Sequence, residues 1–140
     1  MSRIINTDST GKQRSQLTKA VAVALRQLAQ QTEFGDDARD LAAFIALALK
    51  AVHEGIDPSV AAWEKRGYWV KADRFRMEWA WAGSLSARMR EAVLQSNWAE
   101  IAELSIKTAE RLSGVQVSEN ARVGKPWEGA FERLKAGWTT

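Results

Sequence analysis

The sequence predicts an all-α protein, an antiparallel up-and-down four-helix bundle with a short tryptophan-rich carboxy-terminal segment packed across it. Three observations lead to this prediction. Apolar residues recur at helical spacing over long stretches. The 140 residues contain only two prolines and nine glycines. Several of these lie between the apolar stretches, at positions where such residues commonly end one helix or begin the next. We expect one helical domain over residues 1–140, with an arm over 1–10 and a docking segment over 115–140.

The first predicted helix covers residues 17–31, where Leu17, Val21, Ala24 and Leu28 form one apolar stripe. Its start is predicted further upstream, at Ser9 or Thr10. The segment from Thr10 to Gln13 has the spacing of a capping box, in which the hydroxyl and the amide satisfy each other's backbone N–H groups.

The second predicted helix runs from Asp36 to Glu54 and is apolar on every side, so we expect it to be the most buried. Carboxylates in its first turn, Asp40 among them, suit the helix dipole. Gly55 is expected to end it in the left-handed conformation. Asp57 and Pro58 then read as the N-cap and first residue of the next helix.

The third predicted helix extends from Pro58 to Gln95, with a break or kink at Gly67 and a bend at Gly83. The fourth is predicted from the N-cap Asn97 to Gly114, with Glu103 and Lys107 spaced for an ion pair. Its expected buried stripe consists of Trp98, Ile101, Ala102, Ser105, Ala109 and Leu112.

The last quarter of the chain reads differently. A short extended piece is expected at Val115–Val117, followed by a polar loop. After Pro126, apolar side chains return at helical spacing, and the predicted anchor consists of Trp127, Phe131, Leu134 and Trp138. Glycines inside this segment weaken a helix, so it needs a surface to dock on, either its own bundle or a partner chain.

Composition excludes several kinds of chemistry. Without cysteine the chain has no disulfide, zinc–thiolate site, iron–sulfur cluster or cysteine nucleophile. The single histidine, His53, has Lys50 rather than glutamate three residues before it, so a di-iron bundle site is absent. No catalytic residue, metal or cofactor is predicted, and no motif matches a named family.

The longest apolar run, residues 41–49, is far shorter than the roughly 20 residues of a membrane helix, and no signal segment opens the chain. We therefore expect a cytoplasmic protein without a membrane partner. The net charge of +3 and the isoelectric point near 9.4 suggest nucleic acid, but an acidic stretch separates the basic ones. Nucleic acid is a possible partner that the charge map does not favour.

Two segments could bind a ligand. Near the first helix start, Lys12 and Arg14 accompany hydroxyls and a glycine, which suits an anion, although Gln13 replaces the hydroxyl residue of a P-loop. The segment 68–81 mixes aromatic and charged side chains around the whole helix. Its candidate ligand or interface residues are Trp69, Lys71, Asp73, Arg74, Arg76 and Trp81.

Three interpretations of segment 68–81 stay open: a central helix with paired charges, a subunit interface, and a pocket for an acidic or planar ligand. Seven tryptophans exceed what one such bundle needs for its core. The leading hypothesis is therefore a non-catalytic homo-oligomeric binding or scaffold protein, a homodimer or larger. The alternative is a phosphate- or nucleic-acid-binding accessory protein that uses the first helix start and the basic, aromatic third helix.

Overall fold

The computed structural model describes residues 7–117 and 123–137. These residues form six helices and no strand: α1 (Thr7–Ala29), α2 (Asp36–Glu54), α3 (Ile56–Lys65), α4 (Trp69–Leu94), α5 (Trp98–Arg111) and α6 (Ala130–Gly137). The all-α class is therefore confirmed. The extended piece expected at Val115–Val117 is not a strand. No helix in the described ranges is both long and apolar enough to cross a membrane.

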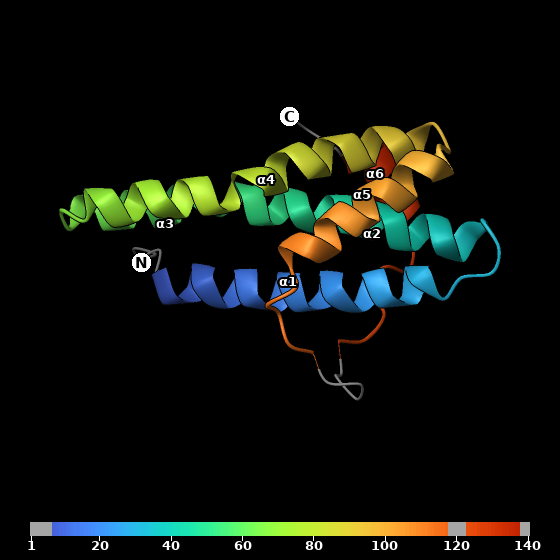
Figure 1. Cartoon of the computed structure of the whole chain (residues 1–140), viewed down its shortest axis with the longest axis horizontal. Helices are drawn as coiled ribbons and strands as arrows, with labels where there is room; N and C mark the ends of the chain where they lie inside the picture. Colours follow the sequence, from blue (N-terminus) through green and yellow to red (C-terminus); the bar gives the residue numbers. More distant parts are fainter. Residues whose placement is uncertain (1–6, 118–122, 138–140) are drawn as a thin grey trace.

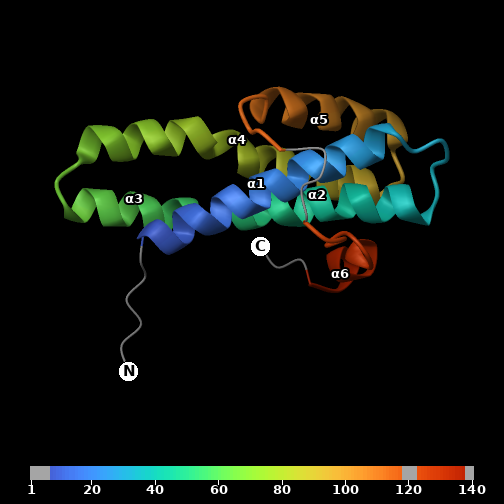
Figure 2. The ribbon, with the colours of Figure 1, turned by 90° about the horizontal axis from the view of Figure 1, so that it is seen from below.

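Helix α2 is the centre of the molecule (Figure 1). Helices α1, α4 and α6 all pack on it, and α5 packs on α4. Helix α3 continues almost in the line of α2, and α4 runs back beside both of them (Figure 2). Ten of the 19 residues of α2 are buried, which confirms that it is the most buried helix.

The junction of α2 and α3 differs from the prediction. Gly55 has φ −80° and ψ −6°, which is right-handed helical geometry and not the left-handed conformation. Because the backbone stays near helical geometry there, α3 begins at Ile56 and keeps the direction of α2. Asp57 is then a first-turn residue and not the N-cap, and no side chain caps α3. Pro58 still fits, since first-turn N–H groups need no helical partner.

The expected third helix is two helices joined as a hairpin. Gly67 has φ +82°, a left-handed conformation that suits glycine, and the chain reverses there. The carbonyl of Trp63 accepts hydrogen bonds from the N–H groups of Arg66 and Tyr68 at 3.0 and 2.9 Å, which closes the turn. Across the hairpin, the rings of Trp63 and Phe75 meet edge-on, 4.9 Å apart. The break at Gly67 is thus confirmed, but it produces a reversal. The four-helix arrangement is not confirmed.

Helix α4 passes through the second expected bend without a break, from Trp69 to Leu94. A side chain at Gly83 would place its Cβ 2.6 Å from Nδ1 of His53. The glycine therefore makes room for the imidazole of α2 and does not end a helix.

The amino-terminal helix begins earlier than expected. Helix α1 starts at Thr7, so Thr10 and Gln13 lie inside it and do not form a capping box at its start. The predicted arm over 1–10 is wrong for residues 7–10, which are helical. The predicted apolar stripe is confirmed: Val21 and Ala24 are buried, and Leu17 and Leu28 pack partly buried against the core.

Helix α6 docks on its own chain. Ala130 and Leu134 are fully buried in the main core, and the Trp127 ring meets Phe44 of α2 edge-on at 6.4 Å. The carboxylate of Asp40 in α2 accepts hydrogen bonds from the N–H groups of Gly129 (3.1 Å) and Phe131 (2.9 Å). A residue of α2 thus satisfies the free donors at the start of α6. Trp138 lies outside the described residues.

Candidate functional site

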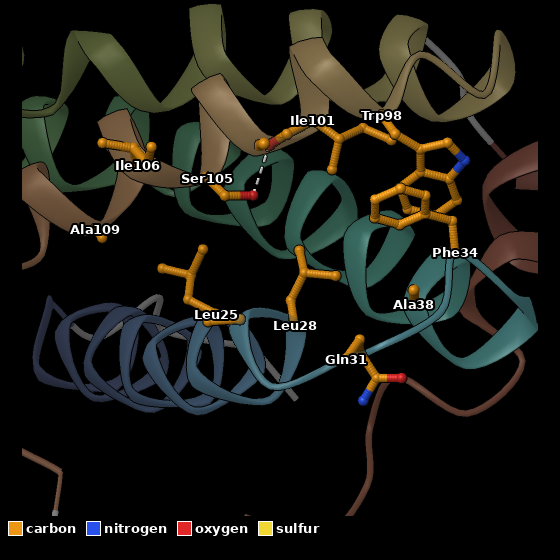
Figure 3. Close-up of a pocket in the computed structure, with 12 residues that line it drawn as sticks. Leu25, Leu28, Gln31, Phe34, Ala38, Trp98, Ile101, Ser105, Ile106 and Ala109 are labelled. Atoms are coloured by element: carbon orange, nitrogen blue, oxygen red, sulfur yellow. Dashed lines mark hydrogen bonds between the residues drawn. The ribbon is translucent and has the colours of Figure 1, made fainter.

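An apolar groove of about 310 Å³ runs between α1 and α5 (Figure 3). Leu25 and Leu28 of α1 face Ile101 and Ser105 of α5 across it, and Ala38 of α2 lies at its base. The other lining residues are Ala29, Gln31, Phe34, Trp98, Ala102, Ile106 and Ala109. Among the described residues, none of the side chains that line the groove is charged.

Two stacked aromatic rings close one end of the groove. Phe34, in the connection between α1 and α2, lies parallel to Trp98 with 4.9 Å between ring centroids and 13° between planes. Trp98 is held at the first position of α5 because the side chain of Asn97 accepts a hydrogen bond from the Glu100 N–H at 3.2 Å. This confirms Asn97 as the N-cap. Phe34 is 71% exposed, so the stacked pair presents an open aromatic face.

Two of the few polar side chains in the groove already donate hydrogen bonds. The Ser105 hydroxyl donates to the carbonyl of Ile101 at 2.7 Å, and the Gln31 amide donates to the carbonyl of Gln27 at 3.3 Å. A guest in the groove would therefore meet apolar surface almost everywhere. Such a surface favours an apolar side chain or molecule over a charged one.

Helix α5 carries two apolar stripes where the sequence predicted one. The buried stripe consists of Ile101, Leu104, Thr108 and Leu112. The expected stripe was partly wrong: Ala102 and Ala109 are exposed and line the groove, while Trp98 and Ser105 are partly buried along it. The buried stripe lies to one side of the expected one because α5 packs mainly on α4. No local sequence signal specifies that direction. The predicted ion pair of Glu103 and Lys107 is present at 3.2 Å.

Arg14 lies far from this groove, between α1 and the α3–α4 hairpin. Its guanidinium stands 4.5 Å from the ring centroid of Phe75 and 5.6 Å from that of Trp79. Burial lowers the pKa of Arg14, and the nearby carboxylate of Glu78 partly opposes that shift. Lys12, its predicted partner at an anion site, is exposed on the same helix. In this arrangement Arg14 packs α1 onto the hairpin.

Several predicted residues of segment 68–81 pair with one another on the hairpin. Arg76 forms ion pairs with Asp73 at 2.9 Å and with Glu64 at 3.7 Å. The Lys71 ammonium lies 5.1 Å from the ring centroid of Trp63. The contacts of Arg76 with Glu64 and of Lys71 with Trp63 join α3 to α4 on the surface of the hairpin, and the pair of Arg76 and Asp73 lies within α4.

The remaining predicted residues lie at two other places. Trp69 and Arg74 border a shallow, open hollow at the end of the hairpin. Trp81 is partly buried against the main core, 5.8 Å from the ring of Trp79. The candidates therefore do not converge on one pocket.

Sequence reasoning missed the groove and its residues Phe34, Ile106 and Leu25. One signal was available in the sequence. Phe34 is a large aromatic residue in a short polar connection, so it belongs to the apolar stripe of neither flanking helix and needs another surface to contact. In the described parts of the chain, no group of three or more His, Asp or Glu side chains is placed to hold a metal ion.

Comparisons of the chain with protein-family models, with curated proteins and with solved structures give no match.

Proposed function

We propose that the protein is a non-catalytic binding or scaffold protein that assembles with itself, and that the groove between α1 and α5 is its assembly surface. The observation that carries this proposal is the second apolar stripe of α5. A helix that has already buried one stripe in its own core needs polar residues elsewhere for solubility. Helix α5 instead turns Ala102, Ile106 and Ala109 toward an uncharged groove.

The shape of the groove supports a helix as its guest. Small residues such as Ala102 and Ala109 let a second backbone approach closely, and Ile106, 62% exposed, supplies an anchor between them. Phe34 also projects from the rim and would be covered in the same contact. In a two-fold dimer both copies use the same surface, so the groove and the rim of one copy would contact those of the other.

Two exposed alanines of α5 provide a matched test. Ala102 lines the groove, and Ala99 lies one turn earlier outside it. We expect the wild-type protein to have a dimeric or larger mass by light scattering. Ala102→Glu should reduce it to a monomer because an unpaired carboxylate would be buried, whereas Ala99→Glu should keep the wild-type mass.

A wild-type mass equal to one chain at every concentration would overturn this proposal. Equal masses for the two variants would show that the assembly surface lies outside the groove.

The alternative function, a phosphate- or nucleic-acid-binding accessory protein, is supported by a different observation. Exposed cations, Lys71 and Arg74 among them, gather at the end of the α3–α4 hairpin. Retention on a phosphate column that falls steeply with salt would support this function. Arg14 contributes less than the sequence suggested, because it is stacked on Phe75 and Trp79.

A further inference from the structure

The end of the α3–α4 hairpin exposes three consecutive apolar side chains. Tyr68, Trp69 and Val70 are 55%, 61% and 68% exposed. They occupy the last residue of the connection and the first turn of α4. Large apolar side chains standing together in water mark a contact site more often than single ones do.

Cations surround these three side chains. Lys65, Arg66, Lys71 and Arg74 are all exposed. The acidic residue of the segment, Asp73, is already paired with Arg76 at 2.9 Å. Residues 65–74 therefore carry a net charge of +3, which equals the net charge of the whole chain. This apolar end is therefore one of the basic stretches of the chain.

The hairpin end is also the part of the molecule that a flat surface could reach. Both views place the connection between α3 and α4 at one extreme of the long axis, beyond the start of α1 (Figures 1 and 2). The hollow there is shallow and open, bordered by residues of the connection and by Arg74. A planar partner would touch the apolar side chains and the cations together.

We propose that the end of the α3–α4 hairpin docks on an anionic phospholipid surface. Trp69 and Tyr68 are the side-chain types that settle at the boundary between headgroups and acyl chains, and Val70 adds aliphatic area. The surrounding lysines and arginines attract the negative headgroups. This contact requires no spanning helix, and it departs from the expectation, drawn from the sequence, that the protein has no membrane partner. The proposal rests on the alternative function above, the binding of a phosphate-bearing partner, and names that partner as a phospholipid surface. It does not depend on the groove between α1 and α5.

Two other partners fit the same end less well. Single-stranded nucleic acid binds best to a charged groove that follows its backbone and to a series of aromatic side chains on which successive bases stack. The hairpin end offers only two neighbouring aromatic side chains, Tyr68 and Trp69, and beside them the aliphatic Val70. A second copy of the chain would bring together two ends that each carry +3, and these would repel one another.

Vesicle flotation tests the proposal with the full chain. The wild-type protein should float with phosphatidylcholine vesicles that contain about one-third phosphatidylglycerol, and not with phosphatidylcholine alone. Lys71→Gln combined with Arg74→Gln should weaken binding about 25-fold, since each cation near the surface contributes about fivefold. Trp69→Ser should also weaken binding by removing the largest inserted side chain.

Matched controls lie elsewhere on the chain. Lys19 and Lys125 are exposed cations outside the hairpin, and Leu94, 37% exposed, is an apolar residue at the other end of α4 that does not line the groove. Lys19→Gln with Lys125→Gln, and Leu94→Ser, should float as the wild type does. Far-ultraviolet circular dichroism should be the same for every variant, because all the changed side chains are exposed.

Equal flotation with both vesicle compositions, or equal loss in tip and control variants, would overturn the proposal. Failure to float combined with salt-sensitive retention on single-stranded DNA would also overturn it, while leaving the alternative function in place. Release of the wild type from anionic vesicles by high salt would support it.

Discussion

The hydrophobic cluster around α2 and the cluster inside the α3–α4 hairpin are built from different side chains. Around α2 the buried residues are nearly all aliphatic side chains or alanine, with Phe44 and Met89 as the exceptions and with Leu41, Ile45 and Leu49 almost completely hidden. The cluster in the hairpin consists of four buried apolar residues, Ile56, Val60, Ala72 and Phe75, and of the partly exposed rings of Trp63 and Trp79. One cluster excludes water by close helix packing, and the other by covering a small area with large rings.

Cations contact aromatic rings in both clusters. Beside the first cluster, Arg39 and Lys135 lie over the partly buried ring of Phe131, whereas in the second the cations lie over the rings that form the cluster itself. Arg14 reaches from α1 to the faces of Phe75 and Trp79, and Lys71 lies over Trp63. The Nη1 atom of Arg14 is buried without a hydrogen-bond partner in the described residues, so its contacts there are with the rings. Two helices alone cannot cover all sides of the cluster between them. The guanidinium of Arg14, from a third helix, covers the side that α3 and α4 leave open. The surplus of tryptophan is thus partly explained by the hairpin.

The largest expected effect belongs to the cluster around α2. Leu49→Ala should lower the free energy of unfolding by about 2–5 kcal/mol, because a fully buried side chain is removed from a closely packed site. Chemical denaturation should show a single transition shifted to lower denaturant. A loss below 1 kcal/mol would mean that this cluster is loosely packed, and the contrast with the hairpin would disappear.

A smaller, local effect is expected where the hairpin meets α1. Arg14→Met should cost about 0.5–2 kcal/mol, because the methionine fills some of the space but supplies no charge to the rings. Amide hydrogen exchange should quicken in α3 and in the first half of α4 and stay unchanged in α2. Lys19→Met, at an exposed position of the same helix, should change neither region. Faster exchange throughout the molecule would show that the two clusters unfold as one.

The smallest effect tests α4 between the two clusters. Gly83→Ala should alter stability little by itself, because the helix gains about 0.5–1 kcal/mol while the His53 ring, 2.6 Å from the new Cβ, must move. In a His53→Ala background the same substitution should stabilise by about 0.5–1 kcal/mol. Thermal melts of the four proteins in this cycle measure the difference. Identical effects in both backgrounds would show that His53 does not constrain this position.

Local sequence signals predicted the helices well where neighbouring residues along the chain decide the structure. The apolar second helix, the Asn97 cap, the pair of Glu103 and Lys107, and the helical spacing at Phe131 and Leu134 are all observed. In each case the relevant residues lie within a few positions of one another. Periodicity and capping describe such relations directly.

The sequence did not predict features that depend on distant segments. Gly67 could equally have marked a kink, and the reversal depends on Trp63 packing against Phe75 across the hairpin. The groove requires α1 and α5 to lie side by side with their lining side chains facing, which no spacing within either helix reveals. For the same reason the buried stripe of α5 was placed too far toward Ala102 and Ala109.

The link from Asp40 to the start of α6 has a consequence for the order in which the chain folds. Its two hydrogen bonds join residues 89 and 91 positions apart. At a synthesis rate of about 5–20 residues per second, Gly129 leaves the ribosome roughly 4–18 seconds after Asp40. During that interval α2 can pack on α1 and α4, but the side next to Phe44 waits for Trp127 and Leu134. A nascent chain therefore carries an uncovered apolar strip until α6 arrives, and that strip is where premature association between chains would begin.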